Sequence, residues 1–247
     1  MRAILISAGQ GTRLLPLTIH VPKCLVEISG RAILDHQIEA LYQAGIEEIV
    51  VVAGYRNDQI REHLENHSTP VRTRLVINPF WSVASSIGSV WAARDHLDDP
   101  FILINGDTVF DSTVIETARR RAQAGVNLVV EPVQDPALDD MRVRVQQGRI
   151  VAVGKKLPIA ETTHRSLGMV LCPDQPGGDY RRALQAVIEE PEGHNAYHHA
   201  VIDRLSRAVG VAAIENTAGL WCEVDRPEDI ERWTRDHRPR PWPRAVP

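Results

Sequence analysis

Short apolar runs of strand length alternate with helical patterns through the first half of the chain. An uninterrupted apolar run of this length is typical of a strand in a parallel sheet that is buried on both faces. The runs that we expect to form strands are Ala3–Ile6, Ile49–Ala53, Leu75–Ile77, Phe101–Ile104 and Asn127–Glu131. Because helical segments separate these strands, the pattern predicts a doubly wound α/β fold.

The segments between the strands carry the periodicity and the end signals of helices. Apolar side chains within Ile33–Ala44 recur on one helical face, and Gly45 follows as a C-cap. Ser85–Asp95 and Ser112–Ala124 are also predicted helices, and Asp111 is placed to cap the second of them. Ligands of doubly wound sheets bind at the carboxyl ends of the strands, so we expect the site beside the loop that follows the first strand.

The second half of the chain is less regular and richer in strands. The sequence MRVRVQQGRIVAVGK alternates on both sides of residues 146–148, as expected for a β-hairpin. Further strands are predicted at Ser166–Cys172 and Gly219–Val224, and further helices at Arg181–Glu189 and Ala196–Ala208. The pattern as a whole predicts a mixed, mainly parallel sheet with a small β-rich insertion.

A single domain accounts for almost the whole chain. A chain of 247 residues can bury a full core, and no internal repeat or linker composition divides it, so we expect one domain over residues 1–235. The last segment, RDHRPRPWPRAVP, has four prolines in its last nine residues. We expect residues 236–247 to form a flexible, Pro/Arg-rich tail.

The composition narrows the classes of partner and compartment. A net charge of −4 argues against a general binder of nucleic acid or of anionic membranes. No apolar run approaches the roughly 18 residues that span a bilayer, and the apolar stretch at the N-terminus is too short for a signal peptide. The three cysteines are isolated and lack metal-ligand spacing, so we expect buried thiols and a cytoplasmic protein.

The loop SAGQGTRLLPLTIHVPKCL after the first strand is a candidate anion site. Gly9 and Gly11 let backbone N–H groups approach a phosphate, and Arg13 and Lys23 add the positive charge that an anion requires. A dinucleotide fingerprint is disfavoured because Leu14 stands where the third glycine of G-x-G-x-x-G belongs, and no P-loop sequence is present. A plain tight turn is the alternative for the glycine pair alone.

This loop resembles the signature of the nucleotidyltransferases that activate sugar phosphates and phospho-alcohols. The family pattern A-G-x-G-T/S-R-L-x-P-L-T, then P-K-x-L, matches SAGQGTRLLPLTIHVPKCLVEISGRAIL at nearly every motif position. The resemblance implies a Rossmann-like nucleotide-binding core, a triphosphate on the loop, and Lys23 as the group that neutralises developing negative charge. The loop residues carried over from the family pattern are Ala8, Gly9, Gly11, Thr12 and Arg13.

Three later segments are similar to the phosphocholine cytidylyltransferase-like branch of that family. They are NPFWSVASSIGSVWAARDHLDDPFILINGDTVFD, DDMRVRVQQGRIVAVGKKLP and GLWCEVDRPEDIERW, so the likeness spans residues 1–235. The resemblance implies CTP rather than UTP, dTTP or GTP, with Ser85, Ser86 and Gly88 near the base. These residues also suit a helix cap. Lys155 is implied at the acceptor phosphate, although the neighbouring Lys156 leaves the register open.

Two aspartates form a candidate metal site. Asp107 follows an apolar strand and a glycine in INGDT, and Asp225 stands in CEVDRPED. Each alone is equally consistent with a cap, the first of a turn and the second of a helix. Together, in a chain with a triphosphate loop, they suit Mg²⁺, which takes one or two carboxylates and completes its shell with phosphate and water. The resemblance places the Mg²⁺ on these two residues.

The acceptor side departs from the choline-type pattern. Arg165, His198 and His199 stand near positions where those relatives carry acidic residues, while Tyr197 keeps an aromatic ring. A quaternary ammonium group favours aromatic faces and negative charge, so this departure argues against choline. We expect surplus positive charge and hence an acceptor with a second anionic group or a polyhydroxyl body. The alternative is that the three residues are solvated or pack away from the site.

These observations predict a Mg²⁺-dependent nucleotidyltransferase, most simply a cytidylyltransferase. It would couple CTP to a small phosphorylated or phosphonylated acceptor and release pyrophosphate. One alternative is a sugar-1-phosphate nucleotidyltransferase that uses UTP, dTTP or GTP, and another is an inactive nucleotide-binding module. We expect no nucleic-acid or membrane partner, and a homodimer remains open.

Overall fold

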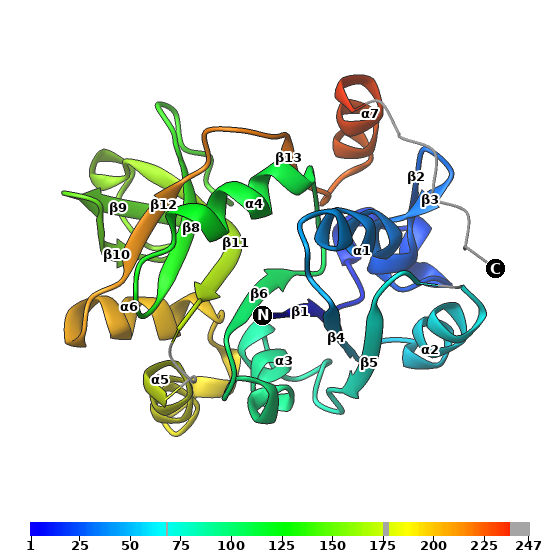
Figure 1. Ribbon diagram of the computed structural model, residues 1–247, viewed down its shortest axis with the longest axis horizontal. Helices are drawn as coiled ribbons and strands as arrows, with labels where there is room; N and C mark the ends of the chain where they lie inside the picture. The colour runs from blue at the N-terminus through cyan, green and yellow to red at the C-terminus, as the bar shows by residue number, and fades with distance from the viewer. Residues whose placement is uncertain (68, 175–177, 238–247) are drawn as a thin grey trace.

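The expected alternation of strands and helices builds one mixed sheet. A computed structural model describes residues 1–67, 69–174 and 178–237, and nine strands of this part form a sheet in the order β5-β4-β1-β6-β11-β8-β12-β10-β9 (Figure 1). The strands are β1 (Arg2–Ser7), β4 (Glu48–Ala53), β5 (Arg72–Ile77), β6 (Phe101–Asn105), β8 (Asn127–Pro132), β9 (Arg142–Gln146), β10 (Arg149–Val153), β11 (His164–Cys172) and β12 (Ala212–Glu215).

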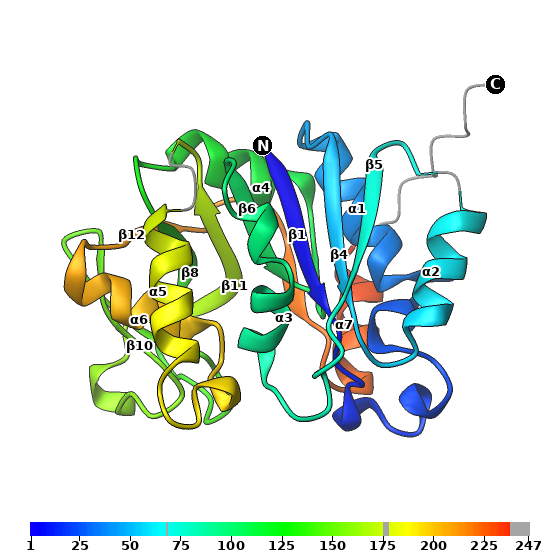
Figure 2. The ribbon, with the colours of Figure 1, turned by 90° about the horizontal axis from the view of Figure 1, so that it is seen from below.

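Helices cover both faces of this sheet, as a doubly wound fold requires. They are α1 (Ile33–Gln43), α2 (Asn57–Asn66), α3 (Ser86–Ala92), α4 (Ser112–Arg121), α5 (Gly178–Ile188), α6 (His199–Ala208) and α7 (Pro227–Asp236). Figure 2 shows α3 and α5 in front of the sheet and α1 behind it. None of the described helices is both long and apolar enough to cross a bilayer.

β1 contributes alternate side chains to the two main apolar cores, one on each face of the sheet. Ile4 and Ile6 pack in the apolar cluster beneath α3, α5 and α6, whereas Ala3 and Leu5 pack in the cluster beneath α1 and α4. Because neighbours along a strand point to opposite faces, an apolar residue at every position is what a doubly covered strand needs. The free thiols of Cys24, Cys172 and Cys222 are buried, which confirms the expectation for the cysteines.

The direction of the strands corrects the expectation of a mainly parallel sheet. β5, β4, β1 and β6 are parallel neighbours, and β8 pairs parallel with β12. β11 runs antiparallel to both β6 and β8, and the β9–β10 hairpin is antiparallel as expected. The sheet is therefore parallel in its first half and largely antiparallel in its second. An apolar run indicates a buried strand but carries no information about its direction.

The second half of the sheet curls back on itself. β11 pairs with β6 and β8, and its first residues, His164 and Arg165, also pair with β9. The register of β11 shifts between Ser166 and Met169, around Gly168 with φ of 68°. A Cβ at Gly168 would lie 2.4 Å from Asn105 Nδ2, so only glycine lets β11 approach the end of β6 this closely. The expected β-rich insertion is thus a continuation of the main sheet.

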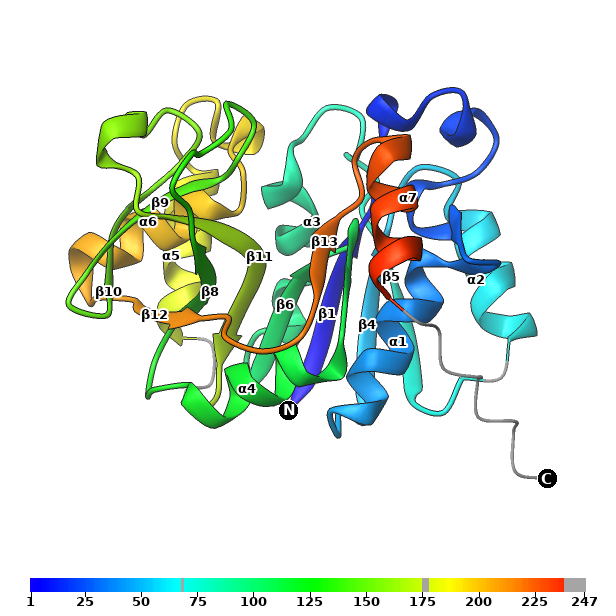
Figure 3. The same cartoon turned by 90° about the horizontal axis from the view of Figure 1, so that it is seen from above.

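A short ribbon carries the C-terminal part of the chain back to the first strands. β7 (Thr108–Phe110) pairs antiparallel with β13 (Trp221–Glu223), and a small hairpin joins β2 (Glu27–Ile28) to β3 (Arg31–Ala32). α7 follows β13 and packs against β13 and β2 (Figure 3). Val109, Val224 and Trp233 lie in a third apolar cluster that holds the ribbon and α7 to the opening loop.

The start of the expected tail is also corrected. Asp236 is the last residue of α7, and the ring of His237 stacks on Trp233 with centroids 4.4 Å apart. These two residues are therefore part of the packed fold. The rest of the expected tail, residues 238–247, lies outside the described residues.

Candidate active site

A cavity of about 330 Å³ lies at the carboxyl ends of β1 and β6, where doubly wound sheets bind their ligands. Its lining includes Ala8 and Gly9 after β1 and Asp107 after β6. The candidate residues that line it are Ala8, Gly9, Arg13, Lys23, Ser85, Ser86, Asp107, Lys155, Tyr197, His198 and His199. The other candidates, Gly11, Thr12, Gly88, Arg165 and Asp225, are not part of its lining.

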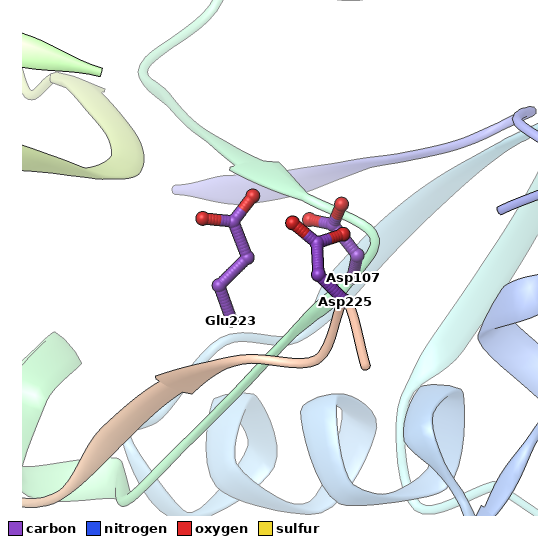
Figure 4. Close-up of side chains that lie close together, drawn as sticks. All are labelled: Asp107, Glu223 and Asp225. Atoms are coloured by element: carbon purple, nitrogen blue, oxygen red, sulfur yellow. The ribbon is translucent and has the colours of Figure 1, made fainter. Parts of the chain in front are cut away.

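Three carboxylates gather at one end of this cavity. Asp107, Glu223 and Asp225 each place an oxygen within 4.8 Å of the others (Figure 4). The β7–β13 ribbon brings them together, since Glu223 pairs with Thr108 and the Val224 N–H donates to the Asp107 carbonyl at 2.8 Å. Side chains alternate along an extended segment, so Glu223 and Asp225 point away from the core in which Val224 packs, and Glu223 lines the cavity.

Lys23 and Arg13 pair with these carboxylates. Lys23 Nζ lies 2.9 Å from Asp107 Oδ2 and 2.6 Å from Asp225 Oδ1, and Arg13 Nη1 lies 2.7 Å from Asp225 Oδ2. Burial lowers the pKa of Lys23, but the charges and hydrogen bonds of Asp107 and Asp225 outweigh it and raise the net pKa above its ordinary value. Lys23 therefore stays charged although only 8% of it is exposed.

The carboxylate cluster fits a divalent cation. Asp107 Oδ1 is buried and has no hydrogen-bond partner among the described residues, so one ligand atom is left unsatisfied. Burial, and after it the charges of Asp107 and Asp225, raise the pKa of Glu223 to about 8, although Lys23 and Arg13 act in the opposite direction. Carboxylate oxygens are the ligands that Mg²⁺ prefers.

The opening loop is shaped by Gly11 more than by Gly9. Gly11 has φ of 76°, and a Cβ there would lie 2.7 Å from Lys23 Cδ, so the loop needs glycine for both its backbone and the stem of Lys23. Its carbonyl accepts a hydrogen bond from Thr18 Oγ1 at 2.8 Å. At Gly9 a Cβ would meet nothing within 4 Å, which leaves an open approach for a ligand.

The predicted base-side residues lie at the start of α3. Ser86 Oγ accepts a hydrogen bond from the His198 N–H at 3.0 Å, and the Ser85 N–H donates to the His194 carbonyl at 2.9 Å. Both serines line the cavity. Gly88 does not, because its Cα faces Ala84: a Cβ there would lie 2.6 Å from Ala84 Cβ. Gly88 therefore allows close packing at this helix.

The expected surplus of positive charge on the acceptor side is wrong for both histidines. His198 and His199 are buried, and burial lowers the pKa of His198 to about 4 and that of His199 well below its ordinary value. Both rings are therefore neutral at neutral pH. Arg165 forms ion pairs with Glu131 and Asp140, so its charge is already balanced.

A lysine and a tyrosine lie together in the lining of the cavity. Lys155 lines it, with Nζ 5.0 Å from the ring centroid of Tyr197, whereas Lys156 is exposed and outside the lining. Arg165 lies over the ring of Trp221 at 5.4 Å, and Trp221 itself lines the cavity. Arg165 thus contacts a lining residue, Trp221, without lining the cavity itself.

Several polar residues of this cavity are not marked by the sequence motifs, among them Glu223, Asn105 and Ser166. Glu223 stands two positions before Asp225, and the period of an extended strand is the signal that could have found it. Asn105 accepts a hydrogen bond from His198 Nε2 at 3.0 Å, and Ser166 Oγ lies 2.9 Å from His199 Nε2. No motif marks Asn105 or Ser166, because their position depends on how β6 and β11 meet.

The fold and the site define a class of enzyme. Residues 2–138 match the family model for nucleotidyl transferase, and the chain belongs to that family. The chain is thus an enzyme of nucleotidyl transfer.

Individual relatives agree on the reaction but differ in the base. The chain is 26% identical over 252 residues to CTP:phosphoglutamine cytidylyltransferase of Campylobacter jejuni, covering 94% of this chain and 98% of that protein. It is 31% identical to the catalytic subunit beta of mannose-1-phosphate guanylyltransferase of Xenopus tropicalis, covering 93% of this chain but 62% of that protein. The inositol-1-phosphate CTP transferase from T. maritima shares the fold, with a TM-score of 0.75, 21% identity and coverage of 92% of this chain and 90% of that one.

Proposed function

We propose that the protein is a Mg²⁺-dependent cytidylyltransferase that joins CTP to a small phosphorylated or phosphonylated acceptor and releases pyrophosphate. The observation that carries this proposal is the distribution of charge in one cavity. Three carboxylates lie beside Lys23 and Arg13 of the opening loop segment, and Lys155 lines the same cavity without pairing with this cluster in any contact of the described residues. This arrangement suits two separate anions, a triphosphate and an acceptor phosphate.

The triphosphate is assigned to the opening loop. Gly9 leaves backbone donors open, and Arg13 and Lys23 supply the charge that a leaving pyrophosphate needs. Thr12 and Gly11 shape the loop behind this surface rather than lining the cavity. The loop follows the carboxyl end of β1, the end at which ligands bind in doubly wound folds.

Asp107 and Asp225 would hold Mg²⁺, with Glu223 as a third carboxylate within reach. When bound, the ion supplies positive charge to the reacting phosphate oxygens and orients them for in-line displacement.

The chemistry needs positioning and charge rather than a nucleophilic side chain. An acceptor oxygen attacks the α-phosphorus of CTP and forms a new P–O bond, while the bond between the α-phosphorus and the bridging oxygen breaks and its electron pair leaves with pyrophosphate. Lys155 would orient the attacking anion and Arg13 would hold the departing one. Because both reactants are negative, neutralising their charge is the main task of the site.

The choice of CTP is supported by the names of two similar proteins, CTP:phosphoglutamine cytidylyltransferase and inositol-1-phosphate CTP transferase. The guanylyltransferase relative keeps GTP as the main alternative. Ser85 and Ser86 are available to read the base edge, since their hydroxyl groups can both donate and accept.

For the acceptor, we infer a polar rather than a cationic body. Neutral side chains dominate the lining around Lys155: Tyr197, Ser166 and Asn105 offer hydrogen-bonding groups. The neutral rings of His198 and His199 also line the cavity and contact Asn105 and Ser166. Phosphoglutamine, named in one relative, is an acceptor of this kind. Arg165 reaches such an acceptor only if it leaves Glu131, so Arg165→Gln tests its role: an increase in the acceptor KM with an unchanged CTP KM supports contact, and no change in either excludes it.

The proposed function is tested by product mass. The protein is incubated with Mg²⁺, each of CTP, UTP, GTP and dTTP, and a library of phosphorylated and phosphonylated metabolites, and pyrophosphate release is followed in parallel. A cytidylylated product with CTP is the expected result. Equal use of all four nucleotides would overturn the CTP assignment, and tight nucleotide binding without pyrophosphate from any acceptor would favour the inactive binding module.

A further inference from the structure

Lys23 occupies the position that a metal ion between Asp107 and Asp225 requires. Its Nζ atom lies 2.9 Å from Asp107 Oδ2 and 2.6 Å from Asp225 Oδ1. Oxygen ligands bind Mg²⁺ at about 2.1 Å, so an ion between the same two oxygens leaves no room for the ammonium group. The two positive charges also repel each other. At these two oxygens the ammonium group and the metal therefore exclude each other.

The stem of Lys23 lies against the triphosphate loop. Its Cβ, Cγ and Cδ atoms are all within 2.9 Å of the place where Gly11 would carry a Cβ. The stem thus crosses the backbone of the loop, and the side chain is long enough for its head to turn from the carboxylates to the loop while the stem stays in contact. Gly11 is what makes this crossing sterically allowed.

We propose that Lys23 is an internal competitor of the metal ion. It neutralises Asp107 and Asp225 until a divalent cation displaces it, and its ammonium group then turns to the phosphates on the loop. The second half of this inference rests on the proposed function, whereas the competition concerns only the protein and the cation. Because metal binding frees the group that the triphosphate needs, metal and nucleotide bind with positive coupling.

The competition is tested by titrating the whole protein with Mn²⁺ in the absence of nucleotide, followed by calorimetry. Lys23→Met and Lys23→Gln remove the competing charge, and Gln keeps a hydrogen-bond donor in case Met fails to fold. Each is expected to bind Mn²⁺ roughly ten- to a hundredfold more tightly than the unmodified protein. Lys156→Met removes an exposed lysine and is expected to leave the affinity unchanged. Equal or weaker affinity in both Lys23 variants would overturn the proposal.

A second measurement separates displacement from a general effect of charge. In the protein without metal, acetic anhydride is expected to label Lys23 slowly, because its amine is buried and paired. Addition of Mn²⁺ is expected to speed the labelling of Lys23 relative to Lys156 in the same sample, as measured by mass spectrometry. Unchanged or slower labelling would exclude displacement.

The outcomes also distinguish this inference from the proposed function. If the unmodified protein releases pyrophosphate from CTP but Mn²⁺ leaves the labelling of Lys23 unchanged, the competitor role fails and the cytidylyltransferase stands. If Mn²⁺ displaces Lys23 but no nucleotide is turned over, the competition stands and the proposed function fails.

Discussion

The aspartates of the carboxylate cluster differ from other acids of the cavity in what they contact. Asp107→Asn and Asp225→Asn keep the side-chain shape but remove the charge that holds a divalent cation. We expect each change to lower kcat by roughly a hundred- to a thousandfold while the circular dichroism spectrum stays unchanged. Asp139→Asn is the matched control, since Asp139 also lines the cavity but, among the described residues, forms its ion pairs with Arg13 and Arg226 and lies outside the carboxylate cluster. Near-normal turnover of both variants at limiting Mg²⁺ would show that Asp107 and Asp225 do not bind the metal and only cap a turn and a helix.

His198 gives the unfolding free energy a dependence on pH. Its pKa is about 4 in the folded protein because of burial, which outweighs the opposing charge of Asp107, and about 6.5 in the unfolded chain. The unfolded chain thus binds the proton more readily, and stability that is complete above pH 6.5 is lost as the pH falls toward 4. The loss approaches about 1.4 kcal/mol per pH unit.

Urea unfolding at pH 7, 6 and 5 checks this dependence. His198→Gln keeps a donor for Asn105 but does not titrate, so its profile should be flatter than that of the unmodified protein. His199 and Lys155 lie close by and are unchanged in this comparison. His194→Gln, at an exposed position, should keep the original slope. Parallel profiles for all three proteins would contradict a buried neutral His198.

Residues within short motifs were placed well from sequence alone, and residues defined by burial were not. Gly9 and Asp107 follow strand ends, Lys23 was assigned from the Pro-Lys motif, and all three line the cavity, whereas Gly11 and Thr12 of the loop do not. The charge of His198 and His199 was misjudged because a sequence does not reveal that β11, α3 and α6 close over these rings. The roles assigned to all these residues stay predictions until they are measured.

At the scale of elements, the opening loop offers a matched pair of glycines. In Gly11→Ala the new Cβ meets the stem of Lys23, and the alanine must keep the left-handed backbone conformation of Gly11. We therefore expect a loss of about 1–3 kcal/mol in the free energy of unfolding. In Gly9→Ala the new Cβ meets nothing within 4 Å, so the free energy of unfolding should change by less than about 0.5 kcal/mol. The KM of the Gly9→Ala variant for CTP should rise instead. Equal unfolding curves for the two variants would contradict this account of the loop.

Elements with a strong periodic pattern were predicted, and short or weakly buried elements were not. α2 buries only Ile60 among its ten residues, so its apolar stripe is too thin to detect. β7 has three residues and was not predicted. β13 lies within the strand expected at Gly219–Val224, but its pairing with β7 depends on a contact across more than a hundred residues of sequence. Glu223 was overlooked for the same reason, since its neighbourhood exists only once this ribbon forms.

At the scale of the whole molecule, Trp233 connects α7 to the carboxylate cluster. It is 3% exposed and packs in the apolar cluster that contains Val109 and Val224, the neighbours of the metal-site residues. Trp233→Ala should cost about 3–5 kcal/mol of unfolding free energy and weaken Mn²⁺ binding, because the ribbon that carries Asp225 loses its support. Calorimetry and urea unfolding on the same samples provide both numbers.

The control for this prediction is Trp91→Ala. Trp91 packs against the apolar cluster beneath α3, α5 and α6, which does not include Val109 or Val224. Its removal should also destabilise the protein but leave the Mn²⁺ affinity unchanged. If the two variants lose Mn²⁺ affinity equally, the effect reflects general destabilisation and not the support of the ribbon.

The ammonium group between the two aspartates has a consequence for how the protein endures a shortage of magnesium. Acidic side chains crowded within 4.8 Å repel one another, and a protein without an internal cation would need the dissolved ion to keep such a region folded. Lys23 relieves this repulsion from within the chain. When magnesium is scarce, the enzyme should therefore stop working yet remain folded, and it should resume as soon as the ion returns, with no new synthesis.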